Sequence, residues 1–470
     1  MSWSPTDPAV RPSSLAALAV ALLLVTAGCS GSPDATPEPT PEPTTDRPPT
    51  DATPTTAGTA TSAGTATPAG TDATTSTTRT ERFPTTTRAT TGTTTADPDE
   101  GADRVRVENG TLPVNATLVF RRVQALLGVD ADPPVVRVNP SGYHRGTPDP
   151  DPFAELVGLA RPAGASLNNS YAAAGSADSV ILLFQNTTTE DVPPEDLAVT
   201  LAHEFVHVIQ DQRRDEAGPL FPEELDADVR TALTEGGAVY VTQVYADRYG
   251  VTNADGNTPI DTRARHYRTR PPWILPVTAE YYFGARYLDR RLDGPGELWG
   301  AYADPPATME GVIHGPGVEP AHSLSVTADA PGWDVTRRGR QGEHVLRAAL
   351  RSELPREDAA AAATGWGNDS PVAFAAGNDA GYAWVVRWDD ADEADEFEDA
   401  ARRFADRRGE AVGGSLRVTR PSSGTVVLLM GPEAFVGTAS VTASDGNVTV
   451  TADPPGRVTP DRPGDARSPG

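Results

Sequence analysis

A low-complexity segment from residue 31 to residue 99 limits what this chain can fold into, because it consists almost only of Thr, Pro, Ala, Gly, Ser and Asp. It includes the sequences TPEPTPEPTT and GTATSAGTATPAGT. Such a segment has too few apolar side chains to form a core, so we expect residues 30–99 to be a disordered stalk. As polyproline II the stalk would reach on the order of 200 Å. Its many Thr residues suit O-glycosylation.

The segment before the stalk has the pattern of an export signal. Arg11 precedes an apolar run over residues 15–25, and this run is shorter than the about 20 residues that span a bilayer. The run closes with Thr-Ala-Gly and Cys29, the only cysteine of the chain, which resembles a lipoprotein signal box. Residues 1–29 therefore predict an exported protein anchored through a lipid on Cys29 to the outer face of the cytoplasmic membrane. An unmodified buried thiol is the alternative.

The charge balance argues against nucleic acid as a partner. The formal net charge is -26, and all 39 basic residues are Arg because the chain contains no Lys. A nucleic-acid-binding protein needs a basic face. Acidic side chains instead keep proteins soluble at molar salt, where the Debye length is about 3 Å. The composition therefore resembles that of proteins from salt-adapted, halophilic archaea.

The remaining sequence predicts an α+β fold in two parts, residues 100–340 and residues 341–452, followed by a disordered tail at 453–470. In the first part we expect short strands at 135–138 and 180–184, the second being a compact apolar run. A helix is expected from about residue 195 to 214, after two prolines. A second long helix is expected from about 223 to 249.

The second part alternates helical and strand patterns, which predicts a small α+β subdomain. We expect Trp366 to be a core anchor within a turn over the sequence GWGND. The other expected elements are helices at 345–354 and 391–408 and strands at 381–388, 416–418 and 425–430.

The first long helix carries an HExxH pattern, with His203, Glu204 and His207. Residues four apart lie on one face of a helix, so both imidazoles can reach a single ion at about 2.0–2.1 Å. Glu204 would lie beside that ion. The alternative is a polar helix whose histidines face solvent or pair with nearby acids.

A candidate third ligand lies on the next helix. Glu235 follows His207 by 28 residues in the sequence ALTEGGAVYV, and two antiparallel helices joined by a short loop would bring it against the histidines. Gly236 and Gly237 each cost a helix up to about 1 kcal/mol relative to Ala. We therefore expect another backbone or a ligand to approach closely at these glycines.

This combination resembles the gluzincin branch of zinc metallopeptidases. The resemblance covers about residues 180–240 and implies a zincin-like core with an edge strand, an HExxH helix and a glutamate helix. It implies that His203, His207 and Glu235 hold Zn²⁺, that Glu204 is the general base, and that residues 180–184 form the edge strand that binds extended peptides. The segments LAHEFVHVIQDQ, TEGGAVYV, ATMEGVIH and GWGND also resemble uncharacterised exported zincin-like lipoproteins, including haloarchaeal ones.

Other polar residues are weaker candidates. His314 could donate to an oxyanion, oriented by Glu310, or could hold a loop in place. Asp226 and Asp228 could accept a hydrogen bond from a ligating imidazole, although a solvated acidic face is the simpler explanation for both. Tyr240 and Tyr245 could stabilise an oxyanion, but packing is the simpler role for both.

The sequence therefore predicts a zinc-dependent hydrolase on the cell surface, most simply a metallopeptidase acting on a peptide or protein. The sequence does not decide whether the site is catalytic. The alternative is a non-catalytic surface or adhesion lipoprotein with a zincin-like scaffold. Nitrogen and oxygen ligands suit zinc, but affinity order alone favours copper.

Overall fold

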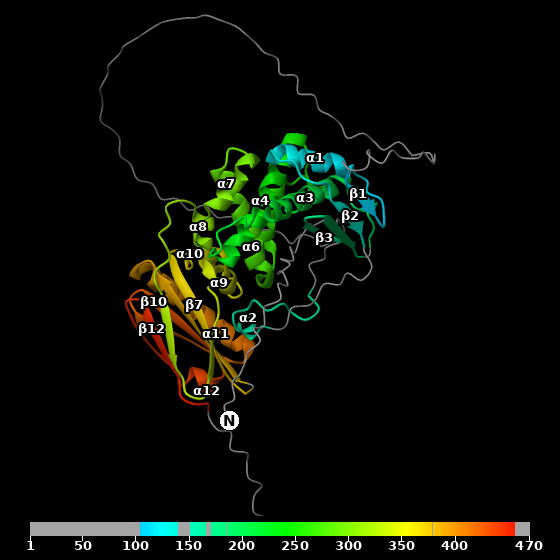
Figure 1. Ribbon diagram of the computed structural model, residues 1–470. Helices are drawn as coiled ribbons and strands as arrows, with labels where there is room; N and C mark the ends of the chain where they lie inside the picture. Colours follow the sequence, from blue (N-terminus) through cyan, green and yellow to red (C-terminus); the bar gives the residue numbers. More distant parts are fainter. Residues whose placement is uncertain (1–103, 140–150, 166–170, 186, 378, 456–470) are drawn as a thin grey trace, which may run out of the picture. The chain divides into compact units, whose positions relative to one another are not determined.

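A computed structural model describes residues 104–139, 151–165, 171–185, 187–377 and 379–455. The expected signal peptide, the lipidated Cys29, the stalk and most of the tail lie outside these residues. Within them, the expected α+β class is confirmed, since helices accompany three separate sheets (Figure 1). No helix of the described part is long and apolar enough to cross a bilayer.

The first sheet has four strands in the order β1-β2-β4-β3. β1 (Arg106–Glu108), β2 (Val135–Val138) and β4 (Ser179–Phe184) are parallel, and β3 (Tyr171–Ser176) pairs antiparallel with β4. The expectation that residues 180–184 form the edge strand is therefore wrong, because they lie inside the sheet and β3 is at the edge. The apolar run of β4 is typical of an interior strand, whereas the sequence YAAAGS of β3 carries a weak strand signal.

Of the two long helices, the first packs on this sheet and the second packs against the first. α3 (Pro194–Ala217) packs on β3 and α1 (Ala116–Leu127), and every residue from Leu201 to Gln210 is buried. A helix that is buried on all sides must pair its polar side chains internally. α4 (Ala227–Tyr249) begins later than expected because Asp226 caps it, accepting a hydrogen bond from the Asp228 backbone N–H at 3.0 Å.

The glycines of α4 allow a very close helix crossing. A Cβ on Gly236 would lie 2.3 Å from the backbone carbon of Gly284 on α6 (Leu275–Arg291), and one on Gly237 would collide with the Tyr302 hydroxyl. The expected close approach of another backbone is thus confirmed at Gly236, whereas the close neighbour of Gly237 is a side chain. The remaining helices of this part are the following: α2 (Pro152–Leu156), α5 (Pro259–Thr269), α7 (Leu298–Ala303), α8 (Met309–His314), and the 3-10 turns η1 (Pro272–Ile274) and η2 (Pro295–Glu297).

The C-terminal part is an antiparallel sheet with a different apolar cluster on each face. Its order is β6-β7-β8-β10-β9, and alternate residues of β8 point to opposite sides. Trp384 and Val386 face the helices, whereas Ala383 and Val385 face the small sheet β11-β12-β5. The elements are β5 (Ser325–Asp329), β6 (Asp334–Arg337), α9 (Gly342–Leu350), α10 (Arg356–Ala361), β7 (Trp366–Ala376), β8 (Asp379–Trp388), α11 (Ala391–Val412), β9 (Ser415–Ser422), β10 (Thr425–Gly431), α12 (Glu433–Val436), β11 (Ser440–Ser444) and β12 (Asn447–Thr451).

Two sequence expectations differ from these sheets. The expected start of the second part at residue 341 falls after β5 and β6, which already pair with β12 and β7. The expected turn over GWGND is wrong beyond Gly365, because Trp366 starts β7 and pairs with Trp388. The pairings of β5 with β12, of β6 with β7 and of Trp366 with Trp388 join residues that are far apart in sequence, so local patterns do not reveal them. Trp366 itself is a core anchor as expected, being fully buried with its Nε1–H donating to Asp369 at 3.0 Å.

Candidate metal centre

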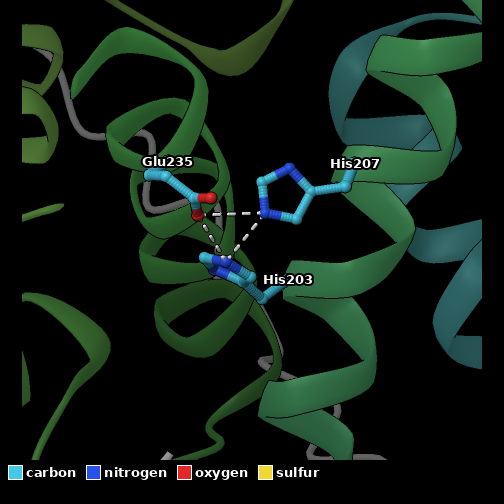
Figure 2. A group of neighbouring side chains, drawn as sticks. All are labelled: His203, His207 and Glu235. Atoms are coloured by element: carbon cyan, nitrogen blue, oxygen red, sulfur yellow. Dashed lines mark hydrogen bonds and ion pairs between the residues drawn. The ribbon is translucent and has the colours of Figure 1, made fainter. Parts of the chain in front are cut away.

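Two histidines of α3 and one glutamate of α4 point towards a common position (Figure 2). His203 Nε2 and His207 Nε2 are 3.1 Å apart. Oε2 of Glu235 lies 3.1 Å from His207 Nε2 and 3.4 Å from His203 Nε2. The structure thus brings together the three residues that the sequence proposed as ligands.

These distances suit a shared ion. Ligand atoms about 2.0–2.1 Å from one ion at tetrahedral angles are about 3.3 Å apart. Two imidazole nitrogens that face each other at 3.1 Å also need a proton or a cation between them, because a lone pair on each would repel the other. The residues present therefore fit a divalent metal held by two nitrogens and one carboxylate oxygen.

The electrostatics of the three groups also call for a cation. Burial lowers the pKa of His203 to about 3. Burial acts in the same direction on His207, but the negative charge of Glu235 outweighs it and raises the pKa of His207 to about 9. Burial opposes ionisation of Glu235, yet the charge and hydrogen bonds of the histidines hold its pKa well below the usual range. Glu235 is thus a buried carboxylate that requires a positive partner.

Gln210 orients one of the candidate ligands. Its Oε1 lies 2.7 Å from His207 Nδ1, so an Nδ1–H donates to it and the Nε2 lone pair is left for a metal. The Gln210 amide nitrogen in turn donates to the Thr234 carbonyl and to the Tyr302 hydroxyl. Sequence reasoning missed this residue, although its position three residues after His207, on the same helix face, was a usable signal.

The acids proposed for that orienting role lie elsewhere. Asp226 caps α4 and lies 3.6 Å from Arg340 Nη1. Oδ2 of Asp228 lies 3.5 Å from Nε2 of His344. The expectation that either acid accepts a hydrogen bond from a ligating imidazole is therefore wrong, because the start of α4 is two turns away from Glu235.

Glu204 has the environment of a proton acceptor. Its side chain is fully buried, and neither carboxylate oxygen makes a regular hydrogen bond within the described residues. Burial raises the pKa of Glu204 to about 7, although His207 partly opposes this rise. A Cβ on Gly175 of β3 would lie 2.6 Å from the Glu204 backbone oxygen and 3.2 Å from Oε2, so the edge strand passes directly beside this group. A carboxyl group that titrates near neutrality suits general base catalysis.

Two further residues at the site carried no sequence motif. The Tyr281 ring on α6 is stacked on His203, with centroids 6.2 Å apart and an interplanar angle of 7°. Burial and the charge of Glu235 raise the pKa of Tyr281 well above its usual value, so the phenol keeps its proton. The guanidinium of Arg263 on α5 lies 4.9 Å from the Tyr281 ring centroid. Burial lowers the pKa of Arg263, whereas Tyr281, Glu235 and Glu204 act in the opposite direction.

The remaining candidates do not join this group. His314 Nε2 lies 3.1 Å from both carboxylate oxygens of Glu343 on α9, so the structure pairs it with Glu343 and not with Glu310. Tyr240 and Tyr245 lie in the apolar core of the first part, as the packing alternative expected.

Comparison with known proteins covers the other end of the chain. A family model described as a domain of unknown function (DUF8575) matches residues 333–459. That range contains the sheet formed by β6 to β10 and does not reach the three candidate ligands. No curated protein and no solved structure matches the chain.

Proposed function

We propose that this protein is a zinc-dependent hydrolase, and more specifically a metallopeptidase that resembles the gluzincins. His203, His207 and Glu235 are the proposed zinc ligands, and Glu204 is the proposed general base. The observation that carries the proposal is the convergence of two Nε2 atoms and one carboxylate oxygen within 3.1–3.4 Å of one another. Beside them lies a second buried carboxylate, Glu204, that makes no regular hydrogen bond within the described residues.

Zinc in such a site acts as a Lewis acid towards a substrate carbonyl and lowers the pKa of water. Glu204 takes a proton from the attacking water and delivers it to the leaving amine. The protonated Tyr281 hydroxyl donates a hydrogen bond to the charge that develops on the carbonyl oxygen. Arg263 lies next to the Tyr281 ring, and its positive charge also stabilises the negative charge that develops on the carbonyl oxygen.

The edge strand supports peptide as the substrate class. β3 is the outermost strand next to β4 in the described sheet, and Gly175 on it lies against Glu204. An extended peptide can pair with such an edge through its backbone. Because Gly175 has no side chain, a peptide paired with β3 at this point would lie close to the proposed base.

The proposed location is the outer face of the cytoplasmic membrane, with a lipid on Cys29 and a stalk between the anchor and the folded part. This follows from the sequence of residues 1–99 alone. A peptide or protein outside the cell is then the substrate, and the acidic surface suits a halophilic setting.

A second function is favoured by one observation. His203, His207 and Glu235 are only 3%, 6% and 4% exposed, and Glu204 is fully buried. A centre so enclosed also suits a metal that only stabilises the helices, as in a non-catalytic surface or adhesion lipoprotein.

Glu204→Gln is the test that separates the two functions. We expect the variant to keep one zinc at this centre, measured by elemental analysis, and to lose 10²- to 10⁴-fold in cleavage of a peptide library. Glu195→Gln, an exposed position of the same helix, is the control and should cleave like wild type. Equal cleavage by Glu204→Gln and wild type would exclude Glu204 as base, and chelator-insensitive or absent cleavage by wild type would favour the structural role.

A further inference from the structure

Asp228, Glu280 and His344 form a second cluster of metal-ligating side chains, on three different helices. One ligand atom from each lies within 4.8 Å of the others. Nε2 of His344 is 3.5 Å from Oδ2 of Asp228 and 3.7 Å from Oε1 of Glu280. Both distances are too long for a hydrogen bond, but they suit atoms that share an ion between them.

The imidazole of His344 is the observation that points to a ligand. Its side chain is 1% exposed, and neither ring nitrogen makes a hydrogen bond within the described residues. Nε2 has only long ion-pair contacts with the two acids. A buried polar ring without a hydrogen-bond partner costs free energy, so such rings are rare. Here Nε2 is directed between two carboxylates, one of which, Glu280, is also buried.

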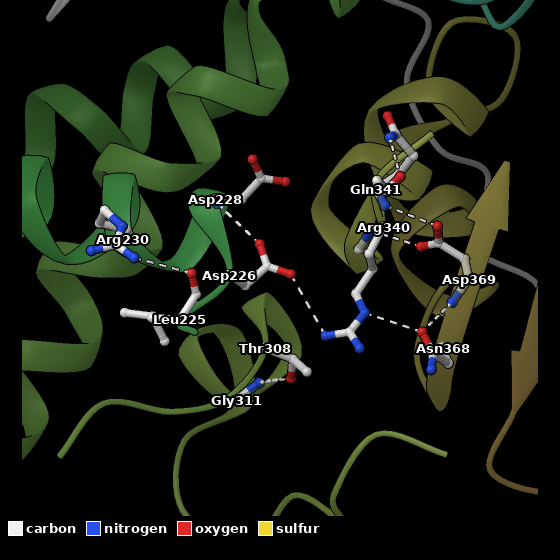
Figure 3. Close-up of polar contacts among 12 residues, drawn as sticks. Leu225, Asp226, Asp228, Arg230, Thr308, Gly311, Arg340, Gln341, Asn368 and Asp369 are labelled. Atoms are coloured by element: carbon white, nitrogen blue, oxygen red, sulfur yellow. Dashed lines mark hydrogen bonds and ion pairs between the residues drawn. The ribbon is translucent and has the colours of Figure 1, made fainter. Parts of the chain in front are cut away.

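The surrounding chain holds His344 in this position. The Asp369 carboxylate accepts hydrogen bonds from the backbone N–H groups of Gln341 at 2.9 Å and Gly342 at 2.7 Å, at the start of α9. Arg340 lies between Asp226 at the start of α4 and Asn368 on β7, as Figure 3 shows. The orientation of α9 relative to α4 is therefore supported by groups outside the cluster, as ligands of a metal require.

We propose that Asp228, Glu280 and His344 bind a second divalent transition-metal ion. One nitrogen and two carboxylate oxygens favour zinc, cobalt or manganese over calcium, which takes oxygen ligands. Asp228 and Glu235 are seven residues apart on α4, so the two centres are about 10 Å apart along the helix. The second ion joins α9, which belongs to the matched C-terminal domain, to α4 and α6, which carry the first centre.

This ion is structural and does not depend on the proposed hydrolase function. Its ligands come from the first turn of α4, from α6 and from α9, so binding it opposes separation of the C-terminal part from the helices. The side chain of Asp228 is 35% exposed, which gives the ion a path from solvent.

Metal counting on the full chain tests the proposal. The probes are Zn²⁺ and Co²⁺ alone, in molar NaCl so that weak binding by surface carboxylates is screened. We expect two ions per chain in wild type, and one each in Asp228→Asn and in His207→Ala. Asp289→Asn, the same chemical change at an exposed position of α6, is the matched control and should keep two.

The outcomes are separable from those of the first centre. One ion in wild type and none in His207→Ala overturns the second site. Two ions retained in Asp228→Asn, or an equal loss in Asp289→Asn, overturns this ligand set. Because Asp228 is partly exposed, Asp228→Asn should fold, and its near-ultraviolet circular dichroism with excess metal verifies this. The absorption of bound Co²⁺ should also lose one component in Asp228→Asn.

Discussion

Nδ1 of His207 lies 2.7 Å from Oε1 of Gln210, one turn further along α3. This contact selects the tautomer in which His207 Nε2 has a free lone pair, next to His203 Nε2 at 3.1 Å. The candidate centre therefore includes a residue that holds a ligand in place and does not itself face the ion.

Gln210→Ala should weaken metal binding at the first centre by about 10- to 100-fold, because His207 loses the acceptor that orients it. Competition with a chelator of known affinity measures the change. Gln212→Ala is the control, since Gln212 on the same helix binds the carbonyls of Asp132 and Ala177 instead. An unchanged affinity in Gln210→Ala would mean that the ring needs no such support.

Tyr281→Phe should lower kcat on the order of 100-fold and leave the metal content unchanged, because one donor to the developing oxyanion is lost. Tyr282→Phe, the neighbouring residue, whose ring stacks on Tyr267 instead, serves as the control. Steady-state kinetics with a cleavable peptide would measure both. If both variants retained wild-type kcat, the oxyanion role of Tyr281 would have to be given up.

Gly236→Ala should destabilise the fold by about 3 kcal/mol, because its Cβ would lie 2.3 Å from the Gly284 backbone and force α4 and α6 apart. Gly300→Ala on α7 is the opposite case, since nothing lies within 4 Å of its Cβ. There the change should stabilise by up to about 1 kcal/mol through helix propensity. Denaturant unfolding of both variants provides the comparison, and similar values for the two would contradict the close crossing.

Glu310→Gln should stabilise the protein at alkaline pH. Burial, together with repulsion from Asp389 and other acids, raises the pKa of Glu310 from 4.5 to about 8. Between these values the folded state keeps a proton that the unfolded state has released, so the free energy of unfolding of wild type falls as pH rises.

The stabilisation by Glu310→Gln should thus be absent near pH 4, grow up to about pH 8 and approach an upper value of about 5 kcal/mol at pH 9, which solvent screening reduces. Thermal melts from pH 4 to pH 9 follow it. The exposed Glu224 provides the control variant Glu224→Gln, which should show no such trend. A difference that stayed constant with pH would show that Glu310 is not a buried acid of this kind.

Features with a local physical cause could be predicted from the residues alone. His203 and His207 share a helix face because their spacing matches one turn, and the prolines before α3 start that helix in place. The Asp226 cap that starts α4 was missed. The position of Glu235 could also be predicted, since a long helix directly after a short loop has few ways to pack. The glycines after it indicated a close contact, and the structure identifies that contact as Gly284 on α6.

Features that depend on chain segments far apart in sequence could not be predicted in this way. β3 is the edge strand because residues 180–184 in β4 pair with β2 on one side and with β3 on the other. Such pairing leaves no local sequence pattern. The same holds for Tyr281 and Arg263 beside the first centre, and for His344, which packing brings within 3.5 Å of Asp228. Hydrogen bonding and periodicity within a helix depend on residues that are close in sequence. Contacts between side chains that are far apart in sequence depend instead on how whole helices and strands bury their apolar faces.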